Sequence, residues 1–307
     1  MVANLTESGS EDQLLSMVTR VGAALRAHVG VGGLTSDQLA NVRASQPANL
    51  ASAKLYAEGL AKLRQFDAAG AKDKFESAIN ADPNDALSHA ALASAWSQLG
   101  YDARAAEQAK VAFDRSTGLA REDRLVIEGA YHNAGKAWDK AIDVYRTLYS
   151  FFPDRVDYGL SLVDAQVAGG KGKDALTTIA KLREPGRSDP RIDLAEARAA
   201  AALGDYRRAR ETNARAADTA SKQGASFERA QALQQQCWAN RNLGQLDEAR
   251  DAGTKAQAIF EENRNARGEA RSLTCVGVVL TASAQEARRE GAPLGTLRDS
   301  ALAHLET

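Results

Sequence analysis

The sequence contains little of what β-sheets, disulfide frameworks and membrane spans require. Only six of its 307 residues are proline and two are cysteine, and aromatic side chains make up 6%. Runs of β-branched residues are sparse and alanine is plentiful, which favours an all-α chain. No apolar run is long enough to cross a membrane. The formal net charge of −1 gives no reason to expect a nucleic acid or an anionic membrane as a partner.

Residues that could carry redox or metal chemistry occur singly. Cys237 and Cys275 fall in apolar or mixed helical sequence, and we interpret them as buried thiols rather than a disulfide or a redox site. None of the four histidines has a second histidine or a cysteine at metal-ligand spacing on the same helix face. The sequence therefore predicts that the chain binds no metal and no cofactor and is not an enzyme.

What the chain does contain is a spaced ladder of small, aromatic and proline residues. Residues 53–85 read as two short helices followed by a stop. The small residue lets two helices approach closely, the aromatic one turn later fills the gap between them, and proline ends the unit. The ladder occurs at Gly59, Ala71, Phe75, Ala78 and Pro83, and again at Gly129, Ala141, Tyr145, Leu148 and Pro153.

Aligned on the small residue of the second helix, the ladder repeats along most of the chain. The alignment residues are Ala71, Ala105, Ala141, Ala175, Ala209 and Ala249, spaced by 34, 36, 34, 34 and 40 residues. This period predicts an all-α, right-handed α-solenoid of about seven helical hairpins. We expect a flexible N-terminus at 1–12, an N-terminal helical pair at 13–49, and the solenoid at 50–307 with a divergent last repeat.

The irregular spacings predict where the solenoid departs from a regular repeat. Residues 116–120 extend the join between the second and third repeats. Residues 217–224 and 257–264 lengthen the second helices of the fifth and sixth units. The proline- and glycine-containing segment 183–190 is the expected bend. After residue 280 the period is lost, and the helix is predicted to run on to about residue 290.

The ladder resembles the tetratricopeptide repeat family over about residues 50–307. A narrower resemblance, in segments 5–26, 43–75 and 118–154, is to the C-terminal repeat region of large bacterial serine/threonine protein kinases. In those proteins a kinase domain, and often a membrane helix, precede the repeats. The chain itself has no glycine-rich GxGxxG loop, no HRD and no DFG, so we expect it to phosphorylate nothing.

In the tetratricopeptide family the first helix of each repeat lines a concave groove, and the resemblance implies which side chains point into it. In the second and third repeats these include Ala90, Ser94, Ser97, Gln98, Ala130 and Asn133. In the later repeats the candidate partner-binding residues are Asp157, Asp164, Arg191, Arg198, Gln231, Gln234, Trp238, Arg241 and Arg271.

The later set is acidic first and then basic, with one tryptophan among the arginines. An arginine guanidinium binds a carboxylate through two parallel hydrogen bonds, and a partly exposed tryptophan can anchor an apolar side chain. We therefore expect the C-terminal half of the solenoid to bind an acidic segment or a free C-terminus. The alternative is that the arginines only pair with Asp193, Glu196 and Glu228 nearby.

The sequence thus predicts a non-catalytic protein–protein interaction module that binds a peptide or partner protein in its groove. The alternative of another class is a regulatory or sensory, self-associating region of a bacterial kinase signalling protein. Residues 1–13 show no charged segment followed by an apolar core, so we expect no signal peptide. As it stands, the chain is predicted to be cytoplasmic, with an extracytoplasmic place as the alternative if a membrane helix precedes it in a longer protein.

Overall fold

The computed structural model describes residues 6–10, 13–30, 32–33, 35–36, 50–183 and 188–289. This described part of the chain is helical and contains no strand. The chain divides into two compact units, Met1–Leu148 and Tyr149–Thr307. The described helices include none that is both long and apolar enough to span a bilayer.

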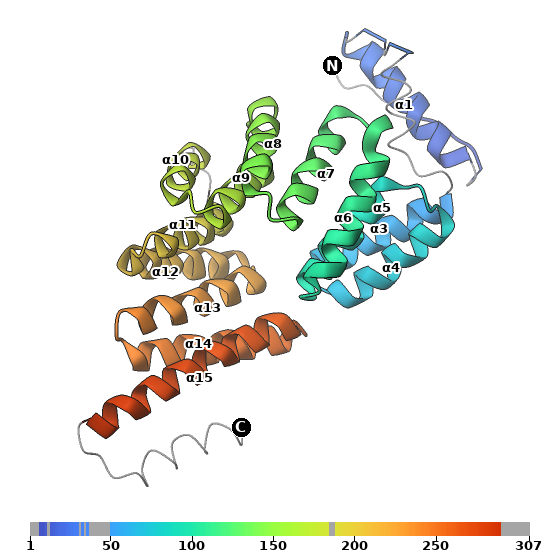
Figure 1. The fold of residues 1–307 in the computed structure, drawn as a ribbon. Coiled ribbons are helices and arrows are strands. Elements are labelled where there is room, and N and C mark those ends of the chain that lie inside the picture. Colours follow the sequence, from blue (N-terminus) through green and yellow to red (C-terminus); the bar gives the residue numbers. More distant parts are fainter. Residues whose placement is uncertain are drawn as a thin grey trace. The chain divides into compact units, whose positions relative to one another are not determined.

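Unit 1 consists of an N-terminal helix and successive helical hairpins (Figure 1). Its helices are α1 (Leu14–His28), α3 (Leu50–Arg64), α4 (Ala68–Ala81), α5 (Ala86–Gln98), α6 (Asp102–Arg115), the 3₁₀ turn η2 (Ser116–Gly118), α7 (Arg121–Ala134) and α8 (Trp138–Phe151), whose last turn enters unit 2. Along the chain from α3 to α7, each α-helix packs on the one that follows, and α5 also contacts both α3 and α7. The turn η2 confirms the predicted extension after the second repeat.

Unit 2 continues with the same arrangement. Its helices are α9 (Val156–Ala168), α10 (Gly172–Leu182), α11 (Pro190–Ala202), α12 (Tyr206–Gln223), α13 (Ser226–Asn242), α14 (Leu246–Glu262) and α15 (Ala266–Arg289). They lie side by side in chain order (Figure 1). The first helices α9, α11, α13 and α15 also contact one another in succession, as the stacking of hairpins in an α-solenoid requires. The predicted solenoid is confirmed, and α12 and α14 are lengthened as expected.

The hairpin turns follow from local sequence. Gly100, Gly170, Gly204 and Gly244 have φ between +74° and +87°, a left-handed conformation that glycine adopts without steric cost. Each lies five residues before its alignment alanine, at the turn predicted between the two helices. Aspartates then cap several helices: the carboxylate of Asp205, for example, accepts a hydrogen bond of 3.1 Å from the backbone N–H of Arg208.

The small–aromatic ladder packs as its spacing predicts. Ala71 and Ala141 are fully buried, and glycine on the first helix makes room for the ring on the second. A Cβ added to Gly59 would lie 2.5 Å from Cε1 of Phe75, and a Cβ on Gly129 would collide with Tyr145 in the same way. Each glycine–aromatic pair therefore locks the two helices of its hairpin together.

The interpretation of the cysteines as free thiols was wrong. Cys237 of α13 and Cys275 of α15 form a disulfide across 38 residues, with Cα atoms 6.5 Å apart and both residues fully buried. Cys237 holds the position that Gly59 and Gly129 hold in their repeats, twelve residues before the alignment alanine. Gly253 stands where those repeats carry the aromatic. A Cβ on Gly253 would lie only 3.1 Å from Sγ of Cys237, so its absence leaves space for the sulfur bridge.

Several predictions fall on residues outside the described part. These are most of the second N-terminal helix and its following turn (37–49), the centre of the expected bend (184–187) and the last segment (290–307). The division into an N-terminal pair and a solenoid stays a prediction.

Candidate functional site

The predicted acidic and basic groove residues face one another in unit 2. Asp157 and Asp164 lie on α9, and Arg191 and Arg198 lie on α11. Nη1 of Arg191 donates to Oδ1 of Asp157 at 2.6 Å, and Nη2 of Arg198 donates to Oδ1 of Asp164 at 2.6 Å. The two residues of each pair are separated by 34 residues, which is one repeat period. Two ion pairs therefore join the first helices of successive repeats, α9 and α11.

These two ion pairs change the charge pattern that the sequence suggested. Two aspartates and two arginines neutralise one another, so α9 and α11 do not present separate acidic and basic patches. A further hydrogen bond to Asp189, together with the one to Asp157, holds the pKa of Arg191 above its ordinary value. The guanidinium is therefore charged and engaged at any ordinary pH.

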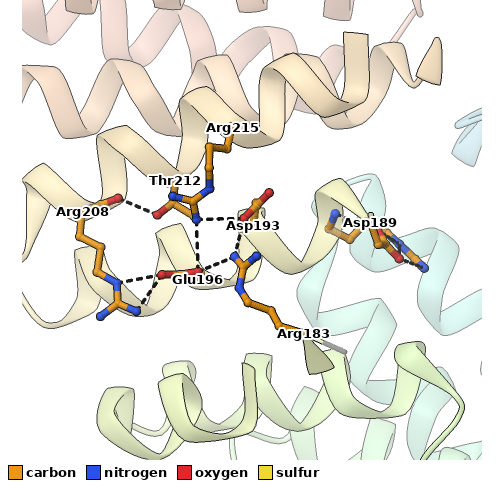
Figure 2. A network of polar contacts seen from close by, with 8 residues as sticks. Arg183, Asp189, Asp193, Glu196, Arg208, Thr212 and Arg215 are labelled. Atoms are coloured by element: carbon orange, nitrogen blue, oxygen red, sulfur yellow. Dashed lines mark hydrogen bonds and ion pairs between the residues drawn. The ribbon is translucent and has the colours of Figure 1, made fainter. Parts of the chain in front are cut away.

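Asp193 and Glu196 belong to a different, buried network. Their side chains are only 12% and 8% exposed, and they receive the guanidinium groups of Arg183, Arg208 and Arg215 (Figure 2). Nε of Arg208 donates to Glu196 at 2.8 Å, and Nη2 of Arg215 donates to Asp193 at 3.1 Å. The alternative that the groove arginines pair with Asp193 and Glu196 was wrong, because these acids bind arginines at the end of α10 and on α12. Glu228, the third acid of that alternative, makes no ion pair among the described residues.

The environment of Glu196 favours its ionised form. Burial alone would raise the pKa of this carboxyl, but the hydrogen bonds from Arg208 and Arg183 outweigh it and hold the pKa below its usual range. Two buried carboxylates with three arginines form a satisfied network. It joins α11 to α12 and to the C-terminal end of α10.

The remaining predicted residues lie on α13 and α15. Gln231, Gln234 and Trp238 are half-buried, and Arg241 and Arg271 are exposed. Trp238 packs against the cluster around the Cys237–Cys275 disulfide. Arg241 makes one long hydrogen bond, 3.5 Å to Oδ1 of Asn242, and in the described part of the chain neither it nor Arg271 has an ion-pair partner.

The structure also contains a cavity in unit 1. It has a volume of about 480 Å³ and lies among α5, α6, α7 and α8. The predicted groove residues that line it are Ala90, Ser94, Ser97, Gln98, Ala130 and Asn133. Second-helix residues that the sequence prediction missed also line it: Asp102, Ala105, Ala109, Ala112, Trp138 and Tyr145.

Two sequence features could have revealed this cavity. The step between the second and third repeats is 36 residues instead of 34. Within the second repeat, Ala93 and Ala109 stand where the first and third repeats carry glycine and an aromatic.

In the described residues, no group of three or more histidine, cysteine, aspartate or glutamate side chains is arranged to hold a metal ion.

Comparison with known proteins identifies the fold. No protein-family model and no curated protein matches the chain. Among solved structures, the apo form of RapI superposes with a TM-score of 0.50 at 13% identity, covering 76% of this chain and 71% of that one. PilW, a type IV pilus biogenesis factor, gives 0.48 at 16% identity, with 72% and 98% covered.

A third match is TTC0263, a thermophilic tetratricopeptide-repeat protein of Thermus thermophilus, with a TM-score of 0.44 at 16% identity and 74% and 99% covered. At these identities the likeness concerns the fold alone. The glycine–aromatic packing and the stacked hairpins of the structure itself identify the architecture. The chain has the fold of the tetratricopeptide-repeat proteins.

Proposed function

We propose that the chain is a non-catalytic scaffold that binds an extended segment of a partner protein through unit 2. The observation that carries this proposal is a contrast among the four predicted arginines. Arg191 and Arg198 are engaged in ion pairs with α9, whereas Arg241 and Arg271 are exposed and have no ion-pair partner in the described residues. Of these four arginines, the two without an ion-pair partner thus lie on α13 and α15.

The chemistry of this surface suits an acidic segment or a free C-terminal carboxylate. An arginine guanidinium binds a carboxylate through two parallel hydrogen bonds. Trp238 lies one turn before Arg241 and is half-buried on a rigid cluster, so it can pack on an apolar side chain of the ligand at little entropic cost. Gln231 and Gln234 offer amide groups to the ligand backbone on the same helix.

The disulfide contributes to this proposed site by fixing the two helices that carry it. Gln234 lies one turn before Cys237 on α13, and Arg271 lies one turn before Cys275 on α15. Because the disulfide bonds Cys237 to Cys275, it restricts sliding of one helix along the other. A surface built from both helices is therefore organised before the ligand arrives, which reduces the cost of binding.

A library of displayed peptides with free C-termini tests the proposal. The wild-type chain should enrich acidic peptides, and a Trp238→Ala/Arg241→Glu variant should bind them at least tenfold more weakly. Arg198→Ala is the matched control, since that arginine is engaged by Asp164, and it should change the affinity less than threefold. Equal binding by the wild type and the double variant, or enrichment without acidic residues, would refute the proposed site.

The resemblance to bacterial kinases, and the self-association that it suggests, stay predictions. For the compartment, the disulfide favours the extracytoplasmic alternative, because buried disulfides persist in oxidising surroundings and are rare in the reducing cytosol.

A further inference from the structure

The cavity in unit 1 has an apolar floor and a polar mouth. Its floor is made of buried side chains: Ala93, Ala105, Ala109, Ala112, Ile127 and Tyr145. Its mouth is made of exposed or half-buried polar groups: Ser94, Ser97, Gln98, Asp102, Asn133 and Lys136. Four helices contribute to it, so it extends between the hairpins and is more than a depression on one helix face.

The cavity exists because the second repeat lacks a ring that its neighbours have. In the first and third repeats the corresponding space holds Phe75 or Tyr145, packed against a glycine on the facing helix. In the second repeat Ala109 replaces the ring, and its partner across the hairpin is Ala93 instead of glycine. The methyl group of Ala93 would obstruct an aromatic at position 109, so the chain cannot fill the space from this helix.

We propose that this cavity receives an aromatic side chain from an extended segment of a partner protein. The floor offers alanine methyl groups, an isoleucine and the Tyr145 ring, which together suit a flat apolar group. The neighbouring repeats show what such a space accepts, since the chain itself places a phenylalanine or tyrosine there. The occupant is thus the ring that the second repeat lacks.

The mouth specifies the residues that flank this ring. Asp102 on α6 and Lys136 just after α7 make no ion pair among the described residues, and both are exposed. A ligand with a basic residue on one side of the aromatic and an acidic residue on the other is complementary to this pair of charges. The amides of Gln98 and Asn133 also line the mouth and can hydrogen-bond the ligand backbone.

This site is separate from the acidic-segment site proposed for unit 2. It lies in unit 1, it selects an aromatic instead of a carboxylate, and it stands whether or not Trp238 and Arg241 bind anything. The two proposals can therefore fail independently.

N-acetyl-phenylalaninamide is a suitable probe, and ¹³C-methyl labelling of alanine provides the readout. A ring that enters the cavity should shift the methyl resonances of Ala105, Ala109 and Ala112 in a saturable manner. For a ligand of this size we expect a dissociation constant of about 1 mM. N-acetyl-glycinamide, which lacks the ring, should produce no saturable shift.

Two variants decide whether the cavity is the site. Ala130→Phe fills it from α7 and should abolish the saturable shifts, while Ala103→Phe places the same ring on an exposed position of α6 and should leave them unchanged. If Ala130→Phe does not fold, Ala93→Gly/Ala109→Phe rebuilds the glycine–aromatic pair and should also abolish binding. Saturable shifts that survive filling, or none in the wild type, would overturn the proposal. The variant Trp238→Ala/Arg241→Glu, which alters only the site in unit 2, should show the same saturable shifts as the wild type.

Discussion

Reduction of the Cys237–Cys275 disulfide should destabilise the C-terminal end of unit 2. The bond closes a loop across 38 residues, and both sulfur atoms are buried among α13, α14 and α15. By the chain-entropy relation, opening a loop of this length costs about 4 kcal/mol of stability. Because each repeat of a solenoid contacts only its neighbours, we expect the loss to be concentrated in α15.

The magnitude is large relative to the stability of a domain of this size. A loss of about 4 kcal/mol corresponds to a fall in Tm of roughly 10 °C for a unit of about 150 residues. The repeat also lacks the aromatic that would hold its helices together without the bond, since Gly253 stands in its place. Away from this position, Phe260 of α14 packs edge-on against Phe227 of α13 and against Gly268 of α15, so the hairpin keeps aromatic contacts at its other end when the bond is opened.

Thermal melts followed by circular dichroism, with and without dithiothreitol, measure this loss. The reduced wild type is the cleaner comparison, because it keeps both sulfur atoms and creates no cavity. Hydrogen exchange should accelerate first in α15 and less in α11. In Cys237→Ala/Cys275→Ala the reductant should have no effect on Tm, which separates loss of the bond from a general effect of the reagent.

One result would refute this reasoning. If thiol titration shows that dithiothreitol has exposed two thiols per chain, and Tm and the exchange of α15 are nevertheless unchanged, the bond does not stabilise this end. The packing around Gly253, together with that of Phe260 against Phe227 and Gly268, would then hold α13, α14 and α15 together without the bond.

Three further predictions follow from the packing and the charges. Gly59→Ala should lower the free energy of unfolding by about 1–3 kcal/mol, because the added Cβ meets the Phe75 ring. Gly277→Ala should raise the free energy of unfolding by up to ~1 kcal/mol, because the space around Gly277 is open and alanine favours the helix. Equal denaturant midpoints for the two variants would contradict this. Glu196 has a lowered folded-state pKa, so its stabilisation is complete above the unfolded pKa and is lost as pH falls through the folded pKa. Glu196→Gln should cost roughly 2 kcal/mol at pH 7 and flatten the acid limb of the stability profile, while exposed Glu248→Gln should do neither. Arg198→Ala should cost less than about 1 kcal/mol, because both partners of its ion pair are partly exposed to solvent. A larger loss in urea titration would show that the pair is stronger than its exposure implies.

The sequence predicts what is local to one repeat. The glycine turns, the buried alignment alanines and the glycine–aromatic pairs all follow from short spacings within one hairpin, and the structure confirms them. Contacts between repeats were harder to predict, because they depend on the register of one hairpin against the next. The Asp164–Arg198 pair could have been found, since its residues are one period apart. The disulfide could not, because its separation of 38 residues is not the basic period.

The departures from the ladder are therefore more informative than its regular positions. Where the glycine–aromatic pair is intact, as in the first and third repeats, the ring fills the space between the two helices of the hairpin. Where Cys237 and Gly253 replace it, a covalent bond fills the space and holds together the helices that carry Trp238 and Arg271. Where two alanines replace it, a cavity remains and its mouth is lined by polar and charged groups. Two positions in the repeat, the one that holds glycine and the one that holds the aromatic, thus distinguish these hairpins. The distinction can be tested by exchanging the residues at both positions between the first and second repeats.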